Sequence, residues 1–186
     1  GGGFKIVILK SGDDRDDSCL LVCTKSRKVF LGVDTNMPNR WVLPKIDVLF
    51  TPFAGGASGF PVRIENFDIS QKIEIINSNR SSVLENHVQQ LISATQPDYV
   101  VPYAGYFMEI NRDKEVKDLN IKNSPEELIS FVESRFPKIK GINPIDTPFF
   151  SLTSEGVVIE GISESPAYFV DQDYIDSIIL DGLKGR

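Results

Sequence analysis

The first third of the chain consists of short apolar segments rich in β-branched residues, and this pattern constrains the fold more than any other feature of the sequence. Polar or Pro- and Gly-containing breaks separate the segments, which is typical of strands joined by turns. The break at 25–27 is short enough for a hairpin. The runs at 6–9 and 19–23 are apolar throughout, which predicts burial on both faces. We therefore expect strands at 4–9, 19–24, 28–33 and 46–51.

Helical patterns begin after these segments. Apolar residues recur at helical spacing over 82–94, where Ser82 and Glu85 form a capping-box pattern. A second helix is predicted to begin at Ser124, with Pro125 in its first position. Further elements are expected at 98–101 and 157–160 as strands and at 173–183 as a helix. This order predicts a single α/β (α+β) domain over residues 1–186, with an exposed sheet edge or a missing neighbour.

Composition excludes two classes of partner. The 20 Lys and Arg residues against 26 Asp and Glu give a net charge of -6, so no nucleic-acid partner is expected. No apolar run approaches the roughly 20 residues that span a bilayer, so we expect no membrane partner and a soluble, cytoplasmic protein. The opening Gly1-Gly2-Gly3 has no initiator Met, which indicates a tag remnant or an excised fragment.

The counts of cysteine and histidine restrict metal and nucleophile chemistry. Cys19 and Cys23 are four residues apart in a predicted strand, which places them about 13 Å apart, beyond the reach of a disulfide or a shared metal. The single histidine, His87, excludes a Rieske cluster and a two-histidine metalloprotease site within this chain. Because His87 falls on the apolar stripe of its predicted helix, helix packing is favoured over a catalytic or ligand role.

Two further segments contain carboxylates in positions that a metal could use. Asp34 follows the predicted strand at 28–33, where a rigid backbone would hold a carboxylate against solvent. It is a candidate metal ligand, and a turn-capping role is the competing interpretation. The acidic segment at 12–18 lacks the spacing of a calcium-binding loop, so a solvated loop is favoured there.

The loops after two other predicted strands are candidates for ligand binding. The segment at 53–61 contains Gly55, Gly56 and Ser58, and such a turn can bring backbone N–H groups close to an anionic ligand. A compact structural loop is an equally good interpretation. Tyr103 and Tyr106 follow the strand at 98–101, where aromatic residues form either a pocket wall or a core turn. We expect these two loops to lie side by side at one end of the sheet.

Five stretches carry a resemblance to a known family. Two are specific strings, FAGGASGFP at 53–61 and PYAGYF at 102–107, and the others are VDTNMPN at 33–39, QPDY at 96–99 and NIKNSPEEL at 120–128. Together, over roughly residues 28 to 135, they resemble the vertebrate-type CMP-N-acetylneuraminate hydroxylase family, specifically its metallo-β-lactamase-like domain.

This resemblance implies an αββα sandwich and places the chain in the second half of it. In the wider metallo-β-lactamase fold, an aspartate at the end of such a strand bridges two metals, which maps onto Asp34. The HxHxDH motif of the first half and the Rieske domain of the hydroxylase are absent from this sequence. The resemblance therefore implies Zn or Fe in the complete protein and no metal in this chain alone.

The sequence thus predicts the C-terminal portion of a metallo-β-lactamase-fold protein resembling CMP-N-acetylneuraminate hydroxylase. It would shape a site for a nucleotide-sugar or another small molecule, within a metal-binding oxidoreductase or hydrolase, and would be inactive alone. Its partner would be the complementary N-terminal half or a second copy in a homodimer. The alternative is a non-catalytic binding or scaffold module that retains the fold without metal.

Overall fold

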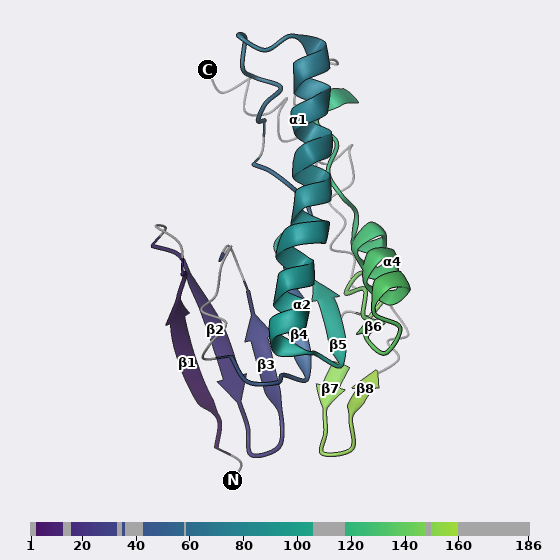
Figure 1. Cartoon of the computed structure of the whole chain (residues 1–186). Coiled ribbons are helices and arrows are strands. Elements are labelled where there is room, and N and C mark those ends of the chain that lie inside the picture. The colour runs from purple at the N-terminus through teal and green to yellow at the C-terminus, as the bar shows by residue number, and fades with distance from the viewer. Residues whose placement is uncertain are drawn as a thin grey trace, which may run out of the picture.

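A six-stranded mixed sheet forms the centre of the computed structural model (Figure 1), which describes residues 3–12, 16–32, 35, 43–57, 59–105, 118–147 and 150–159. The strands lie side by side in sequence order: β1 (Lys5–Lys10), β2 (Ser18–Cys23), β3 (Lys28–Leu31), β4 (Val48–Thr51), β5 (Tyr99–Pro102) and β6 (Lys140–Gly141). β1 to β3 pair antiparallel, and β3 to β6 pair parallel. The predicted α/β class and the hairpin at 25–27 are confirmed.

The main helical stretch begins earlier than the sequence pattern predicted. It runs through α1 (Ile69–Ser82), the π-helix η2 (Val83–Val88) and α2 (Gln89–Thr95). Asp68 caps it, because its carboxylate accepts a hydrogen bond from the Gln71 N–H at 2.9 Å. Ser82, the predicted cap, has helical backbone angles and makes no side-chain cap bond. The start at Ser82 was therefore wrong, since the polar run at 77–82 separates the isoleucines of α1 from the apolar pattern that begins at Val83.

The second helix, α4 (Pro125–Arg135), begins where the sequence predicted. The Ser124 hydroxyl accepts from the Glu127 N–H at 3.2 Å, and the Glu127 carboxylate accepts from the Ser124 N–H at 2.7 Å. A small separate sheet follows, formed by β7 (Phe150–Leu152) and β8 (Val157–Ile159). The sequence predicted β8 but neither β7 nor the two-residue β6. The helix predicted at 173–183 lies outside the described residues.

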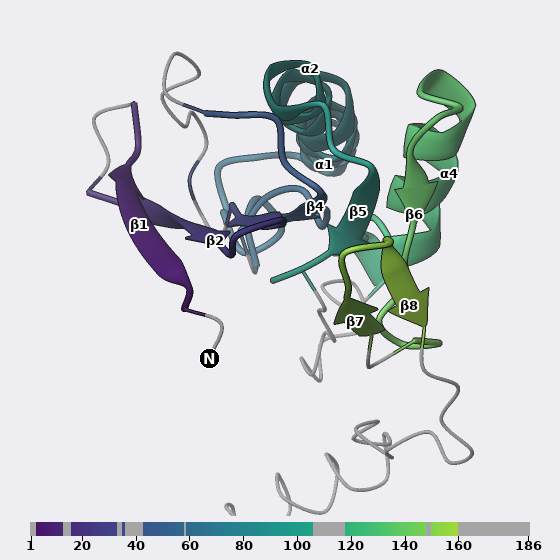
Figure 2. The same ribbon diagram turned by 90° about the horizontal axis from the view of Figure 1, so that it is seen from below.

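The two faces of the main sheet are covered unequally. Helices α1, α2 and α4 lie on one face, and β7 and β8 lie on the other, below β5 and β6 (Figure 2). The helix-covered face contains the larger core, which includes Leu21, Phe30, Leu49 and Val100 and the buried Cys19. On the opposite face, β7 and β8 pack against residues of the β3 to β6 end.

The β1 end of that second face is exposed. Ile6 and Ile8 are 53% and 70% exposed, whereas Val7 and Leu9 pack against the larger core. The apolar run of β1 is therefore buried on one face only, and its second face is uncovered in the described chain, as expected of a sheet with a missing neighbour. Cys19 and Cys23 are free thiols, as predicted. Burial raises the pKa of the Cys19 thiol, so this buried group stays protonated at neutral pH.

Candidate functional site

Two loops leave the same edge of the sheet, because β4 and β5 are parallel neighbours. The loop at 53–57 follows β4, and the segment at 103–105 follows β5. The Tyr103 N–H donates to the Thr51 carbonyl at 2.9 Å, and a Cβ added to Gly105 would lie 2.8 Å from the Phe53 ring. The prediction that these loops lie side by side is confirmed over their described parts.

The glycine loop depends on backbone conformations that favour glycine. Gly55 and Gly56 have φ angles of +80° and +81°. Gly55 also packs directly on α1, since an added Cβ would lie 2.9 Å from both the Arg80 Cα and the Asn79 carbonyl oxygen. Both neighbours are backbone atoms, which cannot easily move.

Five successive carbonyl groups of this loop accept hydrogen bonds from one segment of the chain. The Asn123 side-chain amide donates to the Phe53 carbonyl at 2.9 Å, and the Asn123 N–H donates to the Ala54 carbonyl at the same distance. The Lys122 ammonium donates to the next three carbonyls, at residues 55–57, at 2.9 to 3.1 Å. The segment just before α4 therefore fixes the direction of every carbonyl from 53 to 57.

The N–H groups of the same loop point away from this segment. In a trans peptide the N–H lies opposite the preceding carbonyl, so carbonyls directed at Lys122 and Asn123 turn the N–H groups of residues 55–57 to the other side. Among the residues that the structure describes, none accepts a hydrogen bond from these three N–H groups. They are donors available to an anionic ligand.

Arg80, on α1, connects this helix to α4 and to Asn123, which binds the glycine loop. Its Nε donates to the Asn123 side-chain oxygen at 3.0 Å, and its Nη2 donates to the Glu127 carboxylate at 2.6 Å. The Arg80 carbonyl in turn accepts from the Asn123 side-chain amide at 2.9 Å. A cavity of about 310 Å³ lies between η2 and α4, lined in part by Arg80, Leu84 and Phe131. The π-helix lines this cavity, and such helices are frequent at functional sites.

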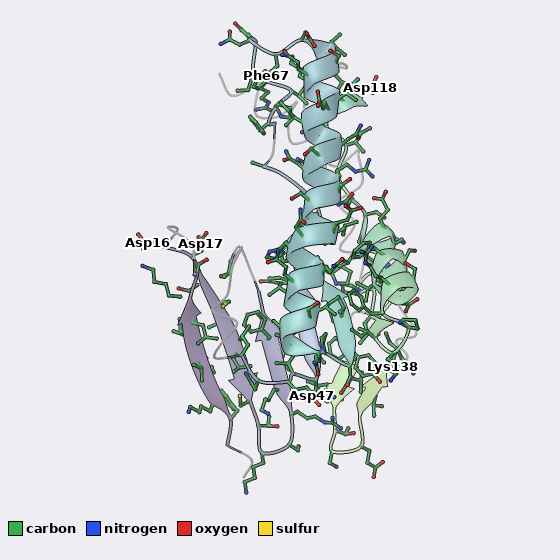
Figure 3. All side chains as sticks on the ribbon, in the orientation of Figure 1. Asp16, Asp17, Asp47, Phe67, Asp118 and Lys138 are labelled. Carbon is green, nitrogen blue, oxygen red and sulfur yellow. The ribbon has the colours of Figure 1, made fainter. Side chains whose placement is uncertain are left out.

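A second cavity, of about 500 Å³, lies at the other end of the molecule. It is lined by Lys45, Asp98, Arg135 and Lys138, among others. Figure 3 shows Lys138 at the end where Asp47 also lies, far from the ends of β4 and β5 that carry the loops. This cavity is therefore separate from the candidate site.

The structure places only some of the predicted site residues. Gly55, Gly56 and Tyr103 lie together at the loop edge, and the Tyr103 ring is 36% exposed and packs edge-on against Phe50. Asp34, Ser58 and Tyr106 lie outside the described residues. Sequence reasoning missed the roles of Lys122, Asn123 and Arg80. Two of them lie in the string NIKNSPEEL, which had been used only as a mark of resemblance.

The described residues alone do not fit a zinc or iron site. Nowhere in the described parts of the chain do three or more His, Cys, Asp or Glu side chains gather in a way that could hold a metal ion. His87 is half-buried within η2. In the acidic segment, Asp16 is 98% exposed and pairs with Lys10 at 3.2 Å. This arrangement agrees with a solvated loop.

These features define a class: a mixed α/β domain in which two loops at one edge of the sheet follow neighbouring parallel strands. No family model matches the sequence. The chain is 40% identical, over 130 residues, to the cytidine monophosphate-N-acetylneuraminic acid hydroxylase of Danio rerio. The aligned region covers 67% of this chain and 22% of that protein. It is 38% identical, over 135 residues, to the hydroxylase of Pongo pygmaeus, covering 70% of this chain and 23% of that protein. The resemblance to this family is confirmed.

The chain spans less than a quarter of the length of these two relatives. Among solved structures, CmlA, a diiron β-hydroxylase from Streptomyces venezuelae, aligns with 76% of this chain and 31% of its own at 17% identity, with a TM-score of 0.43. A structural likeness at this score establishes nothing further by itself. Within the described residues, no helix is both long enough and apolar enough to span a bilayer.

Proposed function

We propose that this chain is the C-terminal portion of a metallo-β-lactamase-fold hydroxylase that acts on a nucleotide-sugar of the CMP-N-acetylneuraminate class. The observation that carries the proposal is the identity of 37–40% to the named hydroxylases over about 70% of the chain. In that family the reaction is an oxygen-dependent hydroxylation of an N-acetyl group. The proposed role of this chain is to shape the substrate site.

The glycine loop is the proposed substrate-binding element. The N–H groups of residues 55–57 are donors without an acceptor among the described residues, and Tyr103, which follows the neighbouring strand β5, is partly exposed. A nucleotide-sugar offers phosphate and carboxylate oxygens as acceptors and flat rings that pack on an aromatic side chain. We propose Ser58 and Tyr106 as further contacts, because they follow directly in the same two loops.

Metal binding is proposed for the complete protein, with Asp34 as the ligand supplied by this chain. The described residues do not form a metal site by themselves. Zinc and iron sites need three or four protein ligands, so one carboxylate cannot hold either metal tightly. The remaining ligands would come from the complementary portion, and this chain alone would be inactive.

The uncovered sheet face supports a complementary portion as the partner. Two rows of apolar residues cross the sheet in register from β1 to β5, through Ile8, Leu20, Leu31, Phe50 and Val101 and through Ile6, Val22, Val29, Val48 and Tyr99. The small β7–β8 sheet packs only on the far end of these rows. A sheet that is apolar on both faces is normally covered on both. The proposed occupant is the second sheet of the sandwich, supplied by the N-terminal portion.

Co-expression tests this proposal. The complementary portion should copurify with this chain. Supplied with dioxygen and a two-electron reductant, the complex should add one oxygen atom to CMP-N-acetylneuraminate and release the other as water, with the product detected by mass spectrometry. Replacing Ile6 and Ile8 by Lys should abolish copurification, whereas Lys5→Glu, on the opposite face of the same strand, should not. A monomer of 20.7 kDa in light scattering that binds no complementary portion would contradict the half-sandwich. A complex that holds no metal and forms no product would favour the non-catalytic module.

A further inference from the structure

We propose that Lys122 is a positioning residue whose ammonium fills a cation site built from three consecutive carbonyl groups of the glycine loop. Its Nζ donates to the carbonyl oxygens of Gly55 and Gly56 at 3.1 Å each and of Ala57 at 2.9 Å. An ammonium carries three N–H donors, so its valence matches three converging acceptors. The loop and Lys122 are 65 to 67 residues apart in sequence, so this is a tertiary contact.

The convergence of these carbonyls requires an unusual backbone. In an extended chain, successive carbonyls alternate in direction. The positive φ angles of Gly55 and Gly56 turn the carbonyls of this loop to one side. Three partial negative charges then lie around one point and repel one another unless a cation sits between them. The Lys122 ammonium supplies that positive charge from within the chain, in the place where a free monovalent cation would otherwise be needed.

The backbone that carries Lys122 is itself held in place by the residues that follow it. Asn123, the next residue, is buried and bonded to the Phe53 and Arg80 carbonyls at 2.9 Å each. Ser124 then caps α4. Lys122 therefore approaches the loop from a fixed base, and its charge selects the loop conformation in which the N–H groups of residues 55–57 face the other side. Arginine would not replace it, because a planar guanidinium cannot place three donors around one point.

Chemical rescue tests the charge separately from the packing. Lys122→Ala removes the ammonium and leaves space for a small cation, whereas Lys122→Met fills the same space without charge. We expect ammonium chloride to raise the melting temperature of the full chain carrying Lys122→Ala by about 3 °C over tetramethylammonium chloride at equal ionic strength. Tetramethylammonium has the charge but no N–H donor. The wild type, Lys122→Met and the exposed-site control Lys138→Ala should show no such difference.

A second measurement uses the unchanged protein. Reductive methylation followed by mass spectrometry should modify Lys122 about tenfold more slowly than the exposed Lys138, because the Lys122 nitrogen is engaged by three carbonyls. Equal reaction rates, or equal melting of Lys122→Ala in the two salts, would overturn the proposal. No ligand enters either experiment, so their failure would leave the proposed hydroxylase function untouched.

Discussion

Replacement of Gly55 by alanine should be among the most damaging small changes in the glycine loop. At a φ of +80° an L-residue is strained by about 1–2 kcal/mol. The new Cβ would also lie 2.9 Å from the Arg80 Cα and the Asn79 carbonyl oxygen, and forced overpacking of this kind costs about 1–3 kcal/mol. The expected loss of unfolding free energy is therefore about 3 kcal/mol. For a domain of this size, it corresponds to about 10 °C in melting temperature.

Three other glycines separate the two causes. Gly156 has a φ of +149° and open space around its Cβ position, so Gly156→Ala should show strain alone, about 1 kcal/mol. The loss of unfolding free energy for Gly56→Ala should lie between the losses for Gly55→Ala and Gly156→Ala. Its added Cβ would lie 3.0 Å from the end of the Asn79 side chain and 3.5 Å from that of Lys122, and both side-chain ends can move. Gly3→Ala meets nothing within 4 Å and should be neutral.

Thermal melts of the four variants, followed by far-ultraviolet circular dichroism, provide the comparison. The reasoning predicts the order Gly55, Gly56, Gly156, Gly3 from most to least destabilised. If Gly55→Ala melted together with Gly156→Ala, the contact between the loop and the backbone of α1 would not exist in solution. The close packing that fixes the candidate site would then be refuted.

Three further predictions follow from other parts of the molecule. Asp47→Asn should lower the unfolding free energy, measured by urea denaturation, by about 2 kcal/mol, because the half-buried Asp47 carboxylate pairs with Arg27 at 2.6 Å. The control Asp98→Asn, in the exposed pair with Lys45, should lower it by less than about 0.5 kcal/mol. The Ser70 hydroxyl holds the pKa of the Asp68 carboxyl below its usual range, so the stability that this carboxylate contributes is lost as the pH falls through that lowered pKa. Asp68→Ala should therefore lower the melting temperature at neutral pH, and by progressively less as the pH falls through that range. The dialysed chain should contain no stoichiometric zinc or iron by elemental analysis, and one tightly held metal per chain would show that it completes a site without a partner.

Local signals explain what could be predicted from the sequence. The start of α4 at Ser124 is set by a hydroxyl and a carboxylate three residues apart, and both are visible in the sequence. The same kind of signal is present at Asp68 and Gln71, but the polar run at 77–82 separates the isoleucines that follow it from the stronger apolar pattern at 83–92. The two-residue β6 has too few residues for any period to show.

Tertiary contacts explain what could not be predicted. Nothing near Lys122 in the sequence indicates three carbonyl partners more than 60 residues away. The exposure of β1 likewise depends on which elements cover the sheet, and an apolar run shows only that a strand can be buried. The fold class and the loop positions were therefore accessible from sequence patterns, whereas the contacts that fix the glycine loop were not.

Three of the five strings that carry the family resemblance meet in space, which explains why these three are informative together. FAGGASGFP begins in the glycine loop, PYAGYF begins beside it at the end of β5, and NIKNSPEEL contains the two residues that bind the loop carbonyls. Each string alone is compatible with an ordinary turn. Their described parts form one connected arrangement, in which a change in any one would alter the direction of the loop N–H groups. These three strings therefore share one structural arrangement, and Lys122 belongs to that arrangement as much as Gly55 does.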